Sequence, residues 1–156
     1  MKRTGFKIKP RKPLKRTAFK KRVKSKTTKK YIANETRKWH DKAWTKWSEL
    51  VRRRAKGICY TCGATKDWKE MHASHFIHDR LDFDERNIHA CCVKCNTYLS
   101  GNLGNYALHL IEDIGLEGIN KLKQDAMQSL ATGLNKVTVE DYQKMCEEFD
   151  IQILLL

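Results

Sequence analysis

Two short stretches, Cys59-Tyr-Thr-Cys62 and Cys92-Val-Lys-Cys95, decide the fold of this chain. A pair of thiolates spaced like this can hold one tetrahedral ion from a tight turn, and two such pairs fill all four positions around it. The spacing therefore predicts a structural zinc site made of these four cysteines, with an iron–sulfur cluster as the alternative. The long interval between the two pairs requires an inserted hairpin.

The two remaining cysteines, Cys91 and Cys146, have no partner at ligand spacing. Cys91 adjoins Cys92, but only Cys92 lies at the Cys-x-x-Cys distance from Cys95. In an intracellular chain, cysteines indicate metal binding rather than disulfides, and a cysteine that binds no metal behaves as a small hydrophobic residue. We therefore expect Cys91 and Cys146 to be buried.

The length of 156 residues suits one compact domain with appendages, and the 40% hydrophobic content allows a modest core. No stretch approaches the roughly 20 apolar residues of a membrane helix. The basic N-terminal residues lead into further basic residues rather than into an apolar segment, which argues against a secretory signal. The composition predicts a soluble cytoplasmic protein with no membrane partner.

Residues 1–30 hold 15 Lys or Arg and no acidic residue, although the net charge of the whole chain is only +14. Such a block repels itself and lacks core-forming residues, so we expect a disordered arm, followed by a folded domain over residues 31–156. The arm should contact nucleic acid, because neutralising phosphates releases condensed counterions. DNA and ribosomal RNA fit the arm equally well.

The rest of the chain carries both helical and strand signals, which predicts an α+β fold. A first helix begins at an N-cap residue, Asn34, carries an apolar stripe through Trp47 to residue 54, and stops at Gly57. A last helix opens at the capping signature Thr138-Val-Glu-Asp. Between them we expect strands at 68–78 and 87–91 around a loop at 79–84, a helix start at 95–99, and helices at 106–114 and 116–130.

Four of the six histidines lie between the cysteine pairs: His72, His75, His78 and His89. A zinc ion bound by four thiolates does not need them, so they indicate a second, reactive site. Hydrolysis of a phosphodiester needs a base for water and a cation that stabilises the charge on phosphate, and neutral imidazole is a suitable base near pH 7. A lone histidine is more often a surface or hydrogen-bonded residue, but this cluster on a basic chain favours a nuclease.

The order Cys-x-x-Cys, His, Asn, Cys-x-x-Cys-Asn resembles the HNH (ββα-metal) endonucleases with a zinc-stapled finger. A longer stretch is similar to the phage recombination proteins of the NinG (Rap) family. This stretch reads Phe83-Asp-Glu-Arg-Asn-Ile-His-Ala-Cys-Cys-Val-Lys-Cys-Asn and continues to Ser100-Gly-Asn-Leu and Tyr106. The similarity spans about residues 57–115 and does not cover the arm.

The resemblance implies a ββα-metal core flanked by helices and a role for each matched residue. His75 matches the histidine that activates water, Asn87 the asparagine that holds the finger loop, and Asn96 a position that helps to bind a catalytic divalent ion, Mg²⁺ or Mn²⁺. Many HNH enzymes have a metal ligand immediately before the base, where this chain has Ser74. His72 is the candidate to supply that ligand.

The resemblance also implies that the chain cuts branched recombination intermediates, such as Holliday junctions and D-loops. Leu99 departs from the family, which often has Lys there, and His89 is either a further site residue or a residue that orients the loop. A symmetric cut of a junction would favour a homodimer. The alternatives are a non-catalytic zinc-finger DNA-binding protein that assists recombination and an RNA-associated zinc protein, neither of which needs His75 and Asn96.

Overall fold

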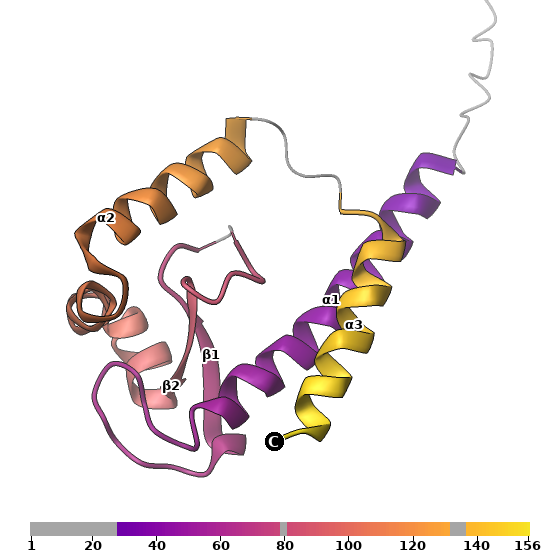
Figure 1. The fold of residues 1–156 in the computed structure, drawn as a ribbon. Coiled ribbons are helices and arrows are strands. Elements are labelled where there is room, and N and C mark those ends of the chain that lie inside the picture. The colour runs from indigo at the N-terminus through magenta and orange to yellow at the C-terminus, as the bar shows by residue number, and fades with distance from the viewer. Residues whose placement is uncertain (1–27, 79–80, 132–136) are drawn as a thin grey trace, which may run out of the picture.

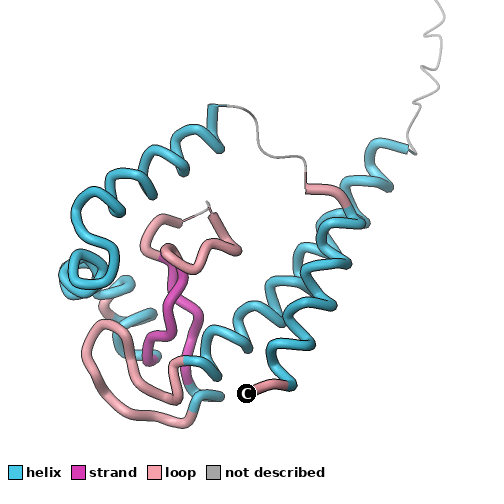
Figure 2. The backbone as a smooth tube through the Cα atoms, viewed as in Figure 1, coloured by secondary structure: helices cyan, strands magenta, loops and turns pink. Residues whose placement is uncertain are grey.

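The computed structural model describes residues 28–78, 81–131 and 137–156, and these form a mixed α+β fold with a small sheet (Figure 1). The main elements are α1 (Thr28–Arg54), β1 (Met71–His75), β2 (Ile88–Cys92), α2 (Leu103–Ala131) and α3 (Val139–Leu154). Loops connect α1 to β1 and β1 to β2 (Figure 2). The α+β class expected from the sequence is confirmed. The expected disordered arm falls largely on residues 1–27, outside the described ranges.

Helix α1 starts earlier than the sequence indicated. The expected N-cap, Asn34, lies inside the helix, which begins at Thr28. No glycine or proline interrupts the residues before Asn34, so the helix continues through it in the N-terminal direction. The other end agrees with expectation: Gly57 has a φ of +77°, and a Cβ there would lie 2.0 Å from the Lys66 carbonyl oxygen. Only glycine fits this turn.

The sheet is a single antiparallel hairpin of two five-residue strands. Its register pairs Met71 with Cys92 at one end and His75 with Ile88 at the other. The strand expected at 68–78 is therefore shorter than predicted, because residues Trp68–Glu70 form a tight helical turn and the chain leaves the sheet after His75. The Asp67 side chain stabilises that turn by accepting a hydrogen bond from the Lys69 amide.

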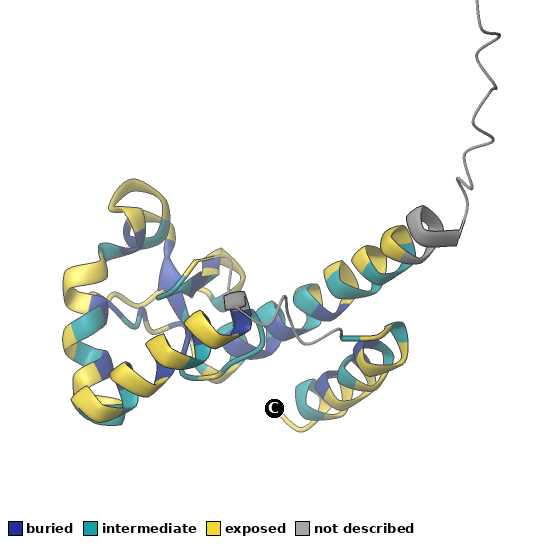
Figure 3. Ribbon diagram, turned by 90° about the horizontal axis from the view of Figure 1, so that it is seen from above, coloured by how far each residue is buried: buried dark blue, intermediate teal, exposed yellow. Residues whose placement is uncertain are grey.

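Helices cover both faces of the hairpin. Alternation along the strands puts His75, Ile88 and Ala90 on one face. That face packs against α1, whose Trp47 and other apolar residues share one buried cluster with it. Tyr106 of α2 packs on the opposite face, where its hydroxyl is fully buried among the strand ends. Figure 3 shows the buried stripes of the helices turned inward.

The C-terminal helices follow the sequence signals closely. Helix α2 is broken at Gly115, whose φ of 70° and ψ of 173° separate two helical segments at the expected boundary. Thr138 and Asp141 form the expected capping box at the start of α3. Helix α3 runs beside α1 in the same direction, with the rings of Trp47 and Phe149 5.1 Å apart (Figure 1). None of the described helices is long and apolar enough to cross a membrane.

Candidate metal centre and active site

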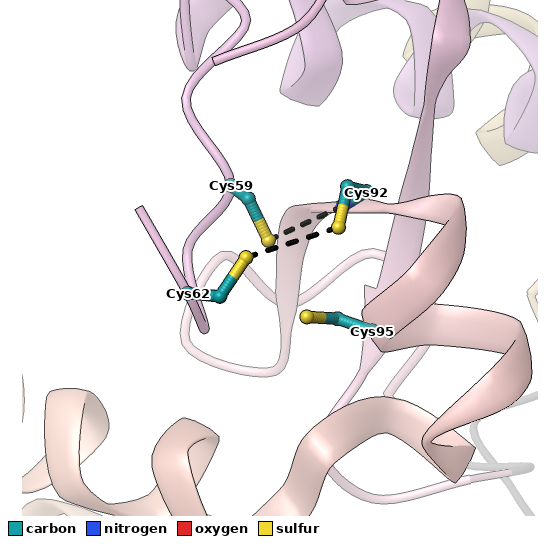
Figure 4. A group of neighbouring side chains, drawn as sticks. All are labelled: Cys59, Cys62, Cys92 and Cys95. Carbon is teal, nitrogen blue, oxygen red and sulfur yellow. Dashed lines mark hydrogen bonds between the residues drawn. The ribbon is translucent and has the colours of Figure 1, made fainter. Parts of the chain in front are cut away.

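The two cysteine pairs converge on one point. Cys59 and Cys62 lie in the turn that follows α1, Cys92 ends β2, and Cys95 lies in the helical turn Lys94–Tyr98. All four sulfur atoms lie within 4.8 Å of one another, and Figure 4 shows them pointing toward a common centre. The group matches the expected set, with Cys92 rather than the fully buried Cys91 as its third member.

Within this four-cysteine cluster the surroundings of Cys59 favour a thiolate, whereas those of Cys62 and Cys92 raise the thiol pKa. Burial alone would raise the pKa of the Cys59 thiol, but hydrogen bonds from the Thr61 hydroxyl and the Cys92 amide outweigh it and lower that pKa to about 6. The Cys92 amide lies 3.2 Å from the Cys59 sulfur. Four close sulfur ligands with three of the side chains buried suit a structural zinc ion, so the residues fit the metal that the spacing indicated.

The two expected ligands of a catalytic ion, His72 and Asn96, are brought together. The Nδ1 atom of His72 on β1 lies 3.0 Å from the Asn96 side-chain nitrogen, on the turn that follows β2. The His72 side chain is exposed, and Asn96 directly follows the last cysteine of the cluster. This pair therefore offers one imidazole nitrogen and one amide group beside each other at the surface.

The expected base, His75, lies in a different environment. Strand alternation directs His72 and His75 to opposite faces of the hairpin. The His75 ring stacks on Trp44 of α1 at a centroid distance of 4.9 Å and an interplanar angle of 19°. Its Nε2 atom lies 3.3 Å from the Asp82 carboxylate. A cavity of about 260 Å³ opens here, and its lining is His40, Trp44, His75, His78 and Asp82.

Asn87 holds the chain that follows β1. Its side chain is fully buried, and its amide oxygen accepts a hydrogen bond of 2.7 Å from the Ile77 amide. The side-chain nitrogen donates to the carbonyls of Ile77, at 3.0 Å, and Leu81, at 3.3 Å. Asn87 therefore fixes the segment between His75 and Asp82, which agrees in geometry with the loop-holding role that the resemblance implied.

Comparison with known proteins identifies the family. The model of the family described as "Bacteriophage Lambda NinG protein" matches residues 2–156, so the likeness covers the arm as well and extends well beyond the expected residues 57–115. This chain belongs to the NinG family. It is 36% identical over 92 residues to protein ninG of Salmonella phage P22 and 34% identical over 92 residues to protein ninG of Escherichia phage lambda. Each match covers 56% of this chain and 45% of the relative, and no solved structure matches.

Within this member of the NinG family, sequence reasoning missed the partners of His75. Asp82 was part of an expected polar loop, and His40 was assigned no role. One signal was available: His40 and Trp44 are four residues apart on α1, so they share a helix face. The contact between His40 and Asp82, which are 42 residues apart in sequence, depends on the path of the loop and has no local signal.

His89 is a packing residue in this structure. Its ring stacks on Tyr60 at 3.8 Å between centroids, and its Nδ1 atom lies 2.9 Å from the Tyr106 hydroxyl. Burial lowers the pKa of His89 to about 4, so its imidazole is neutral at pH 7. Of the two roles left open by the sequence, these contacts favour orientation of the hairpin.

Proposed function

We propose that this chain is a metal-dependent endonuclease that cuts branched DNA, including Holliday junctions and D-loops, with His75 as the general base. The observation that carries the proposal is the placement of His75: a partly exposed imidazole, with 20% of its side-chain surface accessible, beside a carboxylate and a cavity. In this proposal β1, β2 and the helical turn that follows them form a ββα-metal core. The substrate class rests on the resemblance to the NinG family.

The proposed reaction is hydrolysis of one phosphodiester bond. His75 takes a proton from a water molecule as the water oxygen forms a bond to phosphorus. The bond from phosphorus to one sugar oxygen then breaks, and that oxygen takes up a proton from solvent. A bound Mg²⁺ or Mn²⁺ would stabilise the negative charge that develops on phosphate. The resemblance assigns this ion to His72 and Asn96, which lie together on the face of the hairpin opposite His75, so the ion and the base would have to reach the phosphate from different sides of the hairpin.

The charge distribution supports DNA as the partner. The 15 basic residues among positions 1–30 supply cations that can neutralise phosphates without reading the base sequence. In the last turn of α1, Arg53 and Arg54 are paired with Glu49 and Glu85, so the proposed phosphate contacts rest on the arm. Because phosphate contacts position a protein but carry no sequence information, recognition of a branch would depend on the shape of the DNA.

The test is the substitution His75→Ala, assayed on four-way and linear DNA with Mg²⁺ or Mn²⁺ and with an EDTA control. Loss of a positioned base should slow cleavage by about 10²–10⁴-fold. Zinc content and DNA affinity should stay at wild-type values, because His75 lies outside the four-cysteine cluster and the arm.

The matched control is His109→Ala. His109 is also a histidine beside a carboxylate, 3.2 Å from Glu112, but it lies on α2, and 43% of its side-chain surface is exposed. It should cut at the wild-type rate. If His75→Ala cuts as fast as the wild-type chain, the nuclease proposal fails and the non-catalytic DNA-binding role replaces it.

A further inference from the structure

Asp82 joins two histidines from separate parts of the chain. One carboxylate oxygen, Oδ2, lies 3.1 Å from Nε2 of His40 on α1, and the other, Oδ1, lies 3.3 Å from Nε2 of His75 at the end of β1. The three side chains are each between 20% and 32% exposed. They therefore form a partly shielded group that remains open to the cavity beside it.

The contacts indicate how this group is protonated: His40 makes a hydrogen bond to the carboxylate, and Nε2 of His75 lies close enough to donate another. The hydrogen bond from His75 and then that from His40 hold the pKa of the Asp82 carboxyl below its ordinary value. An ionised carboxylate only accepts hydrogen bonds, so an imidazole that binds it must donate an N–H. In His75 the nitrogen that carries the proton is then Nε2, which leaves Nδ1 as the acceptor in the neutral ring.

We propose that Asp82 is the positioning residue of the His75 base and that His40 holds this carboxylate in place. The inference rests on the proposed nuclease function and adds two residues and one helix to its site. Asp82 fixes the tautomer of His75, so Nδ1 takes the proton from water. The resulting imidazolium carries a proton on each nitrogen and is stabilised by the adjacent carboxylate until Nδ1 returns its proton to solvent.

The packing around His75 supports a fixed ring orientation. Trp44 stacks nearly parallel to the imidazole, so a tilt of the His75 ring would break this contact. The carboxylate then determines the remaining rotation, because it holds one edge of the ring. An imidazole held on one face and one edge is already oriented for proton transfer. This orientation is the source of the rate advantage of a positioned base.

The competing role for Asp82 is that of a metal ligand. Among the described residues, the four-cysteine cluster is the one group of His, Cys, Asp or Glu side chains whose ligand atoms gather closely enough to hold an ion. The ligand atoms of His40, His75 and Asp82 are not gathered in this way, although each histidine lies within hydrogen-bond distance of the carboxylate. This geometry favours positioning, and the experiment below separates the two roles.

The test uses the zinc-loaded chain of 156 residues and the substitution Asp82→Ala. Long-range ¹H–¹⁵N NMR spectra of the imidazoles should show His75 as the Nε2–H tautomer in the wild-type chain and as a tautomer mixture in the variant. The kcat for cleavage of four-way DNA at saturating Mn²⁺ should fall by about 10²-fold, the scale expected when a catalytic group loses its orientation. The KM for DNA should change little, and Asp82→Glu should restore part of kcat.

The control is Glu112→Ala, which removes a carboxylate 3.2 Å from His109 and should leave His75 and kcat unchanged. An unchanged tautomer and kcat in Asp82→Ala would overturn the positioning role. A variant that recovers full kcat at high Mn²⁺ would also overturn it and assign Asp82 as a metal ligand. A wild-type chain that does not cut DNA would refute the proposed function, whereas the other outcomes would leave that function standing.

Discussion

The two ends of the hairpin differ in almost every respect, although they belong to the same five-residue ladder. At one end, Met71 pairs with Cys92, which belongs to the cluster of four closely spaced cysteines. We call this the closed end. At the other, His75 pairs with Ile88 and borders a cavity of about 260 Å³. A closed metal site contributes to folding, while a reactive site needs an open position. The hairpin places the four-cysteine cluster and the proposed base at opposite ends, while the proposed divalent ligands His72 and Asn96 lie near the cluster.

The largest loss of stability is expected from a change at the closed end of the hairpin, beside the four-cysteine cluster. Cys95→Ser removes a buried sulfur from the cluster. Structural zinc contributes an apparent 10–16 kcal/mol or so in small zinc domains, which is as large as the usual total stability of about 5–15 kcal/mol. The variant should therefore lack zinc and fail to fold, as measured by metal analysis and circular dichroism.

The control for this change is Cys146→Ser, because Cys146 is buried but lies outside the cluster. It should retain one zinc ion per chain. A folded Cys95→Ser protein with a full zinc content would show that the closed end does not depend on four thiolates.

A smaller loss of stability is expected from a change at the open end of the hairpin, where His75 pairs with Ile88. Asn87→Ala leaves the Ile77 amide and the Ile77 and Leu81 carbonyls without their side-chain partner. Each buried polar group left unpaired costs about 1–3 kcal/mol. The free energy of unfolding in urea should fall by about 3 kcal/mol and cleavage should slow, while zinc content stays at one per chain. Loss of zinc along with stability would mean that the two ends are not separable.

A third prediction concerns the middle of the ladder, where His89 pairs with Ser74. The pKa of His89 falls from 6.5 to about 4 through burial. Below about pH 6.5 the unfolded chain binds a proton here that the folded chain does not bind until about pH 4, so this group destabilises the fold as pH drops through that window. The loss amounts to roughly 2 kcal/mol at pH 5.

The measurement is urea unfolding of the wild-type chain and of His89→Gln at pH 7 and at pH 5. The variant lacks the titrating group, so its stability deficit at pH 7 should narrow by about 2 kcal/mol at pH 5. Protonation of the cysteines affects both proteins alike and cancels in the difference. An equal gap at both pH values would remove His89 from the acid response.

The smallest effect should come from a change remote from both ends. Thr138→Ala breaks the capping box at the start of α3 and should cost about 1 kcal/mol, whereas Thr138→Ser should cost little. Thermal unfolding measures this loss. Zinc content and the cleavage rate should match the wild-type values in both variants. A change in either would show that α3 supports one end of the hairpin directly.

The sequence predicted the closed end well and the open end only in part. Four cysteines in two fixed spacings define a site through local turns, so Cys59 and its partners could be assigned without a fold. Thr138 and Gly115 were equally local signals, and the helix boundaries that they mark agree with expectation. The start of α1 was wrong because Asn34, a good capping residue, is also tolerated inside a helix when the residues before it continue the pattern.

The open end depends on contacts that no local pattern encodes. His75 was chosen from its place in a family motif, and its identity as a base remains a prediction. Its neighbours Asp82 and His40 come from a loop and from α1 and meet only because Asn87 holds the intervening chain in one path. These contacts depend on the tertiary fold, so a single sequence shows that the three residues are present but not that they lie together.

We expect chelation to act on two time scales, one for the proposed divalent site and one for the four-cysteine cluster. An ion at an open site exchanges with solvent readily, whereas one enclosed by four sulfur ligands leaves slowly. A short exposure to chelator would empty only the proposed divalent site, and added Mg²⁺ would restore it. Long exposure would also remove the ion beside Cys92, and because Met71 pairs with that residue, the ladder would separate from that end toward His75. Longer exposure would therefore remove folded structure as well as the proposed divalent ion.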